Sequence, residues 1–367
     1  MALTEKHIYE ALATVKDPEL HRDLVTLRMV KGVDTDGDDV TVKIELTTPA
    51  CPLKETIERD VEAAIRSKAD TVGAVVGSVG VSFTANVRSA GDRGRGADNP
   101  LPDVKHVVAV GAGKGGVGKS TVAVNLAVGL ARHGASVGLL DGDIYGPSVK
   151  TMLGLDNIPT PKPRGNILMP FEIHGIKAMT IGKLVPTDKA LIWRGPMAHN
   201  AFKQLATQTD WGRLDYLIVD LPPGTGDVPL TLTQLLPLTG AVVVCTPQKV
   251  ALEDALRAVK MFQQLGVSVL GMVENMSCFT GDDGKTYDIF GRGGATEMAQ
   301  ELEVPMLGEI AIHMKLRVNC DTGDPLANFA GDGTLAEELD RLCKNVAGQI
   351  SIRALSGEHT QPTLSVT

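Results

Sequence analysis

The residues best suited to chemistry form one glycine-rich run in the middle of the chain. It reads Gly113-Lys114-Gly115-Gly116-Val117-Gly118-Lys119-Ser120 and fits the pattern G-x-x-x-x-G-K-[ST]. Glycines let the backbone curl so that its N–H groups point at phosphate oxygens, and the N-terminus of a following helix adds partial positive charge. The run, together with Thr121, therefore predicts a nucleotide phosphate site. Lys119 would reach the terminal phosphates and Ser120 would ligate Mg²⁺.

Two acidic residues that end apolar runs complete this predicted site. Asp141 ends Leu139-Leu140-Asp141, and Asp220 ends Leu217-Ile218-Val219-Asp220. Open α/β sheets place their ligand residues at the carboxyl ends of strands, so we expect both carboxylates to lie beside the glycine-rich run. A carboxylate at a strand end can also be a plain cap, and that alternative stays open for each residue singly.

The elements that must position these residues alternate along the chain from Val104 onward. Helical stretches such as Ser120–His133 and Leu252–Leu265 separate the apolar runs, and Gly134 and Gly266 sit where helix C-caps belong. Continuous apolar strands between helices indicate a buried parallel sheet with helices on both faces, a doubly wound α/β fold. The strands are expected at His106–Val110, Ser136–Leu140, Tyr216–Val219, Ala241–Cys245 and Val269–Val273.

A smaller unit precedes this domain. Residues 1–87 open with a helix pattern, followed by a half-buried strand at Val40–Leu46, a helix from about Lys54 to Lys68 and a strand near Gly80–Val87, which indicates a small α+β domain. Residues 88–103 are rich in Gly, Arg, Asp and Pro and read as a flexible linker. The P-loop domain is expected over residues 104–349, and the polar tail 350–367 is expected to be disordered.

Composition excludes several classes of protein. The chain has 367 residues, 43% of them hydrophobic, and a net charge of -8, which argues against a nucleic-acid-binding role. It has no run of about 18 apolar residues that would span a membrane, and its charged start is unlike a signal peptide. We therefore expect a cytoplasmic protein. Five widely spread cysteines point to thiol or metal chemistry rather than to a disulfide framework.

The lysine directly after the first glycine, Lys114, adds a resemblance. G-K-G-G-x-G-K-[ST] resembles the deviant Walker A group, which includes MinD, ParA, the nitrogenase iron protein and arsenite-pump ATPases. The resemblance implies a homodimer in which Lys114 reaches the partner's nucleotide. It also implies that Asp141 and Asp220 hold Mg²⁺ through its waters and that Asp143 orients the attacking water. Pro247 and Asn275 fall at the positions that contact adenine. Lys114 as a solvated loop residue is the alternative.

Longer strings resemble the Mrp/ApbC family over residues from about 5 to 345. The family implies an ATP-hydrolysing iron–sulfur cluster carrier that serves assembly or recipient proteins. A Cys-x-x-Cys pair from each subunit of its dimer together holds a [4Fe–4S] cluster. The strings are Asp141–Ser148, Trp193–Met197, Asp220–Asp227, Glu274–Ser277 and Tyr287–Gly291, with Asp17–Leu20 and Thr47–Pro52 in the first domain.

The chain departs from this family at the cluster ligands. By the family's spacing the two cysteine positions fall on Gly281 and Gly284, and the one nearby thiol is Cys278. Two subunits would then offer two thiolates for a labile cluster, with Asp282 or Asp283 assisting, or these acids form an exposed turn and Cys278 is a small apolar filler.

The remaining cysteines divide into one with a candidate role and three without. The family carries a cysteine at the position of Cys51, which is either a reactive or metal-contacting thiol or part of a packed turn. Cys245 and Cys343 are expected in the core. Cys320 is expected on a loop.

Two other functions stay open. A protein without a cluster would be a nucleotide-switched scaffold for other assembly factors, and the missing cysteine pair favours it. A positioning ATPase like MinD or ParA would need a membrane-binding helix or a basic DNA-binding surface. The tail Ser351–Thr367 has neither.

Overall fold

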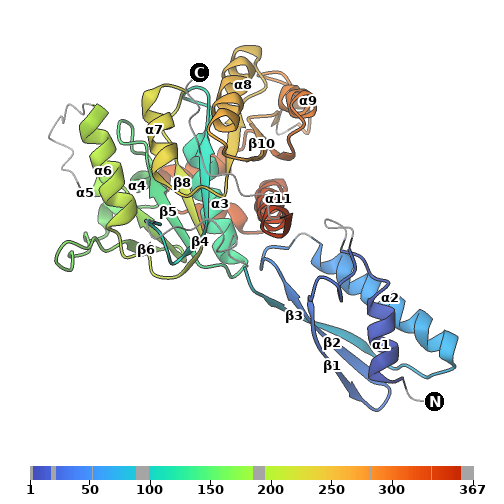
Figure 1. Ribbon diagram of the computed structural model, residues 1–367. Helices are drawn as coiled ribbons and strands as arrows, with labels where there is room; N and C mark the ends of the chain where they lie inside the picture. The colour runs from blue at the N-terminus through green and yellow to red at the C-terminus, as the bar shows by residue number, and fades with distance from the viewer. Residues whose placement is uncertain are drawn as a thin grey trace. The chain divides into compact units, whose positions relative to one another are not determined.

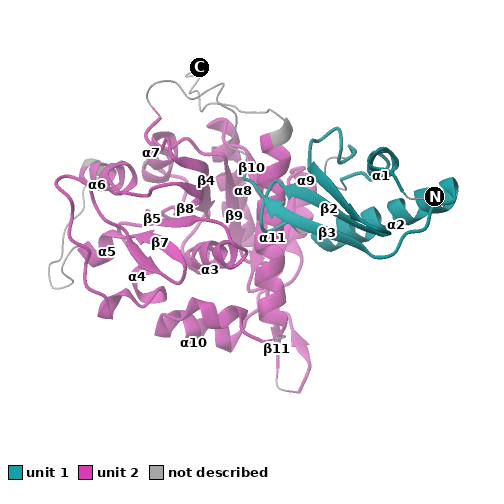
Figure 2. Cartoon of the chain, turned by 90° about the horizontal axis from the view of Figure 1, so that it is seen from below, with its two compact units in different colours: residues 1–88 teal, residues 89–367 magenta. Residues whose placement is uncertain are grey.

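The computed structural model describes residues 3–17, 22–51, 53–87, 99–184, 195–281, 283–331 and 333–356. The chain forms two compact units, Met1–Arg88 and Ser89–Thr367, which are coloured separately in Figure 2. The predictions for residues 88–98, for the end of the tail and for Asp282 lie outside the described residues, as do parts of three family strings.

The first unit is a three-stranded sheet with two helices. Strands β1 and β2 are antiparallel, whereas β2 and β3 are parallel. Strand β2 alternates exposed and buried side chains, as its period of two predicted, and helix α2 packs Ile57, Val61 and Ile65 into the same core. The elements are α1 (Glu5–Leu12), β1 (Val30–Asp36), β2 (Asp39–Leu46), α2 (Lys54–Val72) and β3 (Val79–Ala85).

The second unit is built on an eight-stranded sheet in the order β13-β10-β9-β4-β8-β5-β7-β6. Figure 1 labels β4, β5, β6, β8 and β10 of this sheet. All neighbours in it are parallel except the pair β6 and β7 at one edge. This confirms the predicted parallel α/β sheet. The strands are β4 (Val104–Gly111), β5 (Val137–Asp141), β6 (Phe171–Ile173), β7 (Ile176–Met179), β8 (Leu214–Asp220), β9 (Gly240–Cys245), β10 (Val269–Asn275) and β13 (Met306–Ile310).

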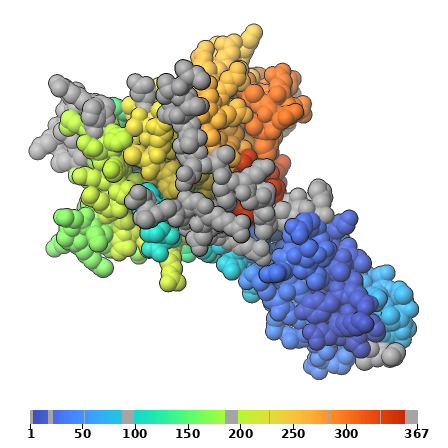
Figure 3. Space-filling model, in the orientation of Figure 1, coloured from blue at the N-terminus to red at the C-terminus, as the bar shows by residue number. Residues whose placement is uncertain are grey.

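Helices cover both faces of this sheet. In Figure 2, α6 and α7 lie on one side of it and α3 lies on the other. Figure 3 shows α6 beside α7, and α8 beside α9, on the surface of the unit. The helices are α3 (Lys119–Arg132), α4 (Val149–Met152), α5 (Ile181–Leu184), α6 (Gly195–Thr207), α7 (Asp227–Leu235), α8 (Lys249–Gln264), α9 (Gly294–Glu301), α10 (Met314–Thr322) and α11 (Thr334–Ser356).

Helix α3, which follows the glycine-rich run, is buried in the core of the second unit. Its side chains from Val122 to Leu130 are all buried, because the helix lies between the sheet and α11. Sequence expectations for α3 and for α8 hold within a few residues. Among helices of the described residues, none is long and apolar enough to cross a membrane.

Two boundaries differ from expectation. Helix α11 runs to Ser356, beyond the start of the predicted tail, because Ile350 and Ser351 are buried and extend its packed face. Cys320 was expected on a loop but lies in α10, where its thiol is buried. The sulfur contacts the Nδ2 atoms of Asn125 and Asn328 at 3.8 and 3.9 Å, so polar packing against α3 favours helix there.

Candidate functional site

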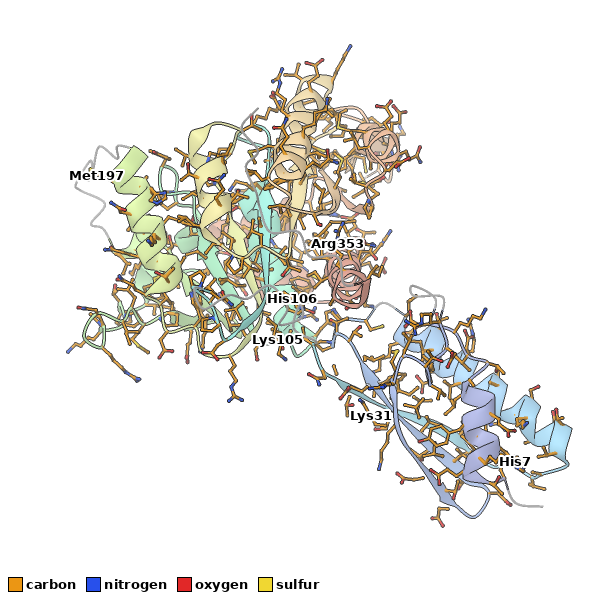
Figure 4. All side chains as sticks on the ribbon, viewed as in Figure 1. His7, Lys31, Lys105, His106, Met197 and Arg353 are labelled. Carbon is orange, nitrogen blue, oxygen red and sulfur yellow. The ribbon has the colours of Figure 1, made fainter. Side chains whose placement is uncertain are left out.

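The glycine-rich run forms the loop between strand β4 and helix α3. Lys105 and His106, labelled in Figure 4, lie near the amino end of β4, and the loop leaves its carboxyl end. Gly118 is the N-cap of α3 and has φ +82°, a left-handed conformation that favours glycine. A Cβ atom at Gly113 would lie 2.0 Å from the carbonyl oxygen of Asp254. Glycine is therefore required where the loop passes α8.

A cavity of about 230 Å³ opens over this loop. Both lysines of the run line it, as does Asp143 from the loop after β5. The structure thus brings together most of the predicted phosphate-binding residues. The lining residues are Lys114, Gly115, Gly116, Gly118, Lys119, Ser120, Thr121, Asp143, Ser148, Met152 and Pro223.

Lys119 lines this cavity and contacts two carboxylates. Its Nζ atom lies 2.5 Å from Oδ1 of Asp220 and 3.9 Å from Oδ2 of Asp143, and it donates to Oγ of Ser120 at 3.2 Å. The lysine side chain is only 6% exposed. A phosphate group entering the cavity would compete with Asp220 for this ammonium. The lysine therefore links the phosphate loop to the end of β8.

The carboxylates of Asp141 and Asp220 lie on neighbouring strands, where the two residues are paired in register. Both are fully buried. Asp141 accepts a hydrogen bond from Oγ1 of Thr180 at 2.8 Å and one from the backbone N–H of Asp143 at 3.2 Å. Burial and then the charge of Asp220 raise the pKa of Asp141 to about 8. Burial also raises the pKa of Asp220, although the ammonium of Lys119 opposes the shift.

The carboxylate and hydroxyl oxygens at this point of the structure are suitable ligands for Mg²⁺. Oδ2 of Asp220 is buried and has no hydrogen-bond partner among the described residues, so it can accept a metal-bound water. Carboxylate and hydroxyl oxygens are the groups that this hard cation prefers. Its double charge would favour the ionised forms of Asp141 and Asp220, against the effect of their burial. Ser120, Asp141 and Asp220 are therefore the residues that would hold it.

Asn275 and Pro247 lie at the carboxyl ends of the neighbouring strands β10 and β9. Asn275 ends β10, is buried, and donates from Nδ2 to the carbonyl oxygen of Val117 at 2.8 Å. Pro247 follows β9 and is buried beside Gly291. The structure thus gives Asn275 a contact that the sequence did not reveal, because it supports the phosphate loop from beneath. Contact of either residue with adenine stays a prediction.

The segment that carries Cys278 is fixed at both ends. At its start, the backbone N–H of Ser277 donates to Ile310, and the carbonyl of Cys278 accepts from the N–H of Ile312 at 2.7 Å. At its end, the buried carboxylate of Glu274 accepts the N–H groups of Gly293 and Ala295 at 3.0 and 2.8 Å. The Cys278 side chain is half-buried.

The positions expected for the family's cysteine pair lie in a hairpin turn. Strands β11 (Phe279–Thr280) and β12 (Thr286–Tyr287) flank it, and Gly284 has φ +75°. The Asp283 carboxylate accepts the N–H of Lys285 at 3.1 Å, as expected of a turn. Within the described part of the chain, no three His, Cys, Asp or Glu side chains gather closely enough to hold a metal.

The other cysteines differ sharply in environment. Cys51 is half-buried and packs against the core of the first unit, just before α2. Cys245 and Cys343 are core residues, as predicted. Burial raises the pKa of Cys245 to about 12 and raises the pKa of Cys343 as well. These two thiols are therefore uncharged and inert in the folded protein.

Sequence reasoning missed several residues of the site. Ser148 and Pro223 occur in strings already matched to a family but had no role assigned, and Met152 had no signal at all. Thr180 also carried no signal, because it touches Asp141 through a strand pairing that the sequence does not reveal.

Family models match both units. The model for the NUBPL iron-transfer P-loop NTPase of the ParA group matches residues 103–347, and the model for the iron–sulfur cluster assembly protein matches residues 5–76. The iron–sulfur cluster carrier protein of Deinococcus radiodurans is 50% identical over 350 residues, which cover 95% of this chain and 96% of that one. The carrier protein of Synechocystis is 46% identical over 361 residues, 96% and 99% of the two chains.

Solved structures agree with this assignment. The nucleotide-binding protein of Archaeoglobus fulgidus in complex with ADP is 37% identical, with a TM-score of 0.54, and the match covers 62% of this chain and 89% of that one. The cell division ATPase MinD of Pyrococcus furiosus, at 20% identity and a TM-score of 0.50, shares the fold over 66% of this chain and 98% of its own. With both units matched and half of all aligned residues identical to a full-length relative, the chain belongs to the NUBPL iron-transfer P-loop NTPase family.

Proposed function

We propose that this protein is an ATP-hydrolysing carrier of iron–sulfur clusters that works as a nucleotide-switched homodimer. One combination supports the proposal above all. A phosphate cavity lined by two lysines, one of which contacts the buried carboxylate of Asp220, occurs in a chain that resembles named cluster carriers across both of its units. The partners would be proteins that assemble clusters or receive them.

Polar residues in and beside the cavity have distinct parts in ATP hydrolysis. Lys119 binds the terminal phosphates, and Ser120, Asp141 and Asp220 would hold Mg²⁺, which would neutralise phosphate charge. The carboxylate of Asp143 lies at the cavity wall and orients the attacking water. Lys114 lines the same cavity and reaches the nucleotide of the partner subunit, where it stabilises the charge that develops during phosphoryl transfer.

Nucleotide binding would be communicated through the loops at the strand ends. The loop after β5 carries Asp143, and the loop after β8 carries Pro223, and both line the phosphate cavity. ATP closes the dimer by engaging these loops, and hydrolysis releases them. The cluster is cargo in this cycle, and the Cys278 thiol of each subunit would supply its anchor.

A scaffold without a cluster is the second candidate. The observation that favours it is the hairpin turn at Gly281 and Gly284, which puts glycines where the family has cysteines. Such a protein would use the same ATP cycle to control partner binding. For either function we propose the cytoplasm as the compartment, because five widely spread cysteines, an odd number, point to thiol or metal chemistry rather than to a disulfide framework.

The deciding experiment is anaerobic reconstitution followed by iron and sulfide analysis per chain, with ATP turnover measured on the same samples. Three proteins are compared: the wild type, Cys278→Ala and Cys51→Ala. Cys51 is the matched control because its thiol is also half-buried but lies in the other unit. The carrier proposal expects a cluster that Cys278→Ala loses and Cys51→Ala keeps, with turnover in all three.

Other outcomes would redirect the proposal. A cluster that survives Cys278→Ala and is lost in Cys51→Ala would move the anchor to the first unit. If the proteins hydrolyse ATP but none of the three binds iron, the result would support the scaffold. Absence of ATP turnover in the wild type would contradict both candidates.

A further inference from the structure

The hydroxyl of Thr180 lies at the junction of two structural elements next to the phosphate cavity. Thr180 directly follows strand β7, and its side chain is completely buried. Its Oγ1 donates to Oδ2 of Asp141 at 2.8 Å and accepts the backbone N–H of Gly182 at 3.1 Å. One hydroxyl therefore joins a carboxylate of the magnesium site to the first turn of α5.

The turn that Thr180 holds packs against the loop after β5. A Cβ atom placed on Gly182 would lie 3.0 Å from Cβ and 3.1 Å from Cγ of Pro147. Pro147 follows Asp143 in the same loop, and Asp143 lines the phosphate cavity. Gly182 therefore lies in close contact with the loop that carries Asp143.

Asp141 supports the same loop from inside. Its Oδ1 accepts the backbone N–H of Asp143, and the Asp143 side chain in turn accepts the N–H of Gly146. Because Oδ2 accepts the hydrogen bond from Thr180, both oxygens of the Asp141 carboxylate accept a hydrogen bond. Lys119 bonds to the other carboxylate, Asp220, so the hydroxyl of Thr180 is a principal donor that fixes the orientation of Asp141.

We propose that Thr180 is a positioning residue for magnesium binding and for the loop that carries Asp143. It acts through Asp141 on one side and through Gly182 and Pro147 on the other. The inference rests on the proposed ATP hydrolysis and assigns a residue to it that the sequence motifs do not contain. The alternative is a purely structural role, in which the threonine fills space and its hydroxyl has no influence on the site.

The test compares four variants of the full chain with the wild type. Thr180→Val removes the hydroxyl but keeps the shape, Thr180→Ser keeps the hydroxyl, and Thr180→Ala removes it without adding bulk. Thr209→Val is the matched control, because Thr209 is also buried in this unit and donates to a backbone carbonyl, that of Leu205, at 2.6 Å. The readouts are the thermal midpoint, ATP turnover, and binding of a fluorescent ADP analogue over a range of Mg²⁺ concentrations.

The proposal expects a specific pattern. Thr180→Val weakens the Mg²⁺ dependence of ADP binding by about tenfold or more and lowers kcat by a similar factor, as loss of a partner of a metal ligand does. ADP binding without Mg²⁺ stays close to the wild type. Thr180→Ser retains the wild-type Mg²⁺ dependence, and Thr209→Val shifts the thermal midpoint alone. If Thr180→Val does not fold, Thr180→Ala carries the same expectation.

Three results would overturn it. They are a wild-type Mg²⁺ dependence in the variants that lack the hydroxyl, equal defects in Thr180→Ser and Thr180→Val, or the same defect in Thr209→Val. Failure of the proposed function is separate from these. A wild type that binds ADP with Mg²⁺ but does not hydrolyse ATP contradicts the ATPase proposal, while the binding titration still tests Thr180.

Discussion

The side-chain nitrogen of Lys119 and the Oδ1 atom of Asp220 lie 2.5 Å apart, although 101 residues separate them in the sequence. Both side chains are buried, at 6% and 0% exposure. A buried ion pair gains its attraction only while both partners are present, because each lone charge pays the full cost of desolvation. This ion pair thus joins the phosphate loop to strand β8, and removal of either partner is expected to lower the free energy of unfolding.

We therefore predict that Lys119→Ala has two effects. ATP turnover is abolished because the terminal phosphates lose their ammonium, and the free energy of unfolding falls by about 3–5 kcal/mol because Asp220 is left without its counter-charge. Urea unfolding and a turnover assay measure the two. The double variant Lys119→Ala with Asp220→Asn should recover part of the stability and none of the turnover. A single variant as stable as the wild type would refute the coupling.

Lys114→Ala should lower ATP turnover by about 10³-fold while leaving ADP binding largely intact, as loss of a charge-stabilising group supplied by a partner subunit does. Lys105→Ala is the control, since Lys105 pairs with Asp215 near the opposite end of β4. Mixing Lys114→Ala with Lys119→Ala tests the action across subunits. In a mixed dimer, the Lys114→Ala subunit keeps its own Lys119 and receives Lys114 from its partner, so one nucleotide site should regain turnover. If the mixture stays inactive, Lys114 acts on the nucleotide of its own subunit.

The phosphate loop should tolerate one glycine replacement better than another. Gly116 and Gly118 both have φ +82°, so Gly→Ala strains the backbone equally at each. A Cβ atom at Gly118 would also lie 2.1 Å from Nδ2 of Asn275, whereas nothing lies within 4 Å of one at Gly116. Gly118→Ala should therefore weaken ADP binding and stability clearly more than Gly116→Ala. Equal losses in calorimetric titrations would show that Asn275 does not constrain the loop.

Thiol labelling should separate the cysteines into two groups. Cys51 and Cys278 are half-buried and should react with iodoacetamide in the folded protein, whereas Cys245, Cys320 and Cys343 are buried and carry raised pKa values that keep them as thiols. Mass spectrometry of labelled peptides, with and without urea, measures this. Fast labelling of Cys245 in the native protein would contradict the packing of β9.

The buried carboxylate of Asp141 should make stability depend on pH. Its pKa is about 8 in the folded protein, against an ordinary value of 3.8, so between these values the folded state keeps a proton that the unfolded state releases. The free energy of unfolding therefore falls as pH rises through this window and levels off above about 8. Urea unfolding in a chelator, for the wild type and Asp141→Asn, measures the difference. A wild type whose stability rises more steeply with pH than that of Asp141→Asn would reverse the sign and refute the assignment.

The glycine-rich loop between a strand and a helix was predictable because its residues follow each other in the chain. A loop from Gly113 to Ser120 needs its glycines locally, and an apolar strand on one side and a helix on the other confirm its setting. Asp141 and Asp220 were predictable for a related reason, since parallel strands deliver their last residues to one edge. The parallel sheet itself followed from runs of buried residues.

What escaped prediction depends on contacts between distant segments. Strand β1 alternates poorly between buried and exposed residues, so its pairing with β2 was invisible in the sequence. The short strands β6 and β7 form through packing at a sheet edge rather than through a strong local pattern. Thr180 and Asn275 acquire their partners, Asp141 and Val117, only when strands β7 and β10 enter the sheet.

Glu274 and Asn275, neighbours at the end of β10, fix the two ends of the segment that carries Cys278. The carboxylate of Glu274 accepts the N–H groups of Gly293 and Ala295 and so fixes the end of that segment. Its neighbour Asn275 donates to Val117 and so fixes the start of that segment to the phosphate loop. The segment from Ser277 to Arg292 lies between these two attachments, so we expect substitutions of its exposed side chains to leave the contact of Asn275 with the phosphate loop in place.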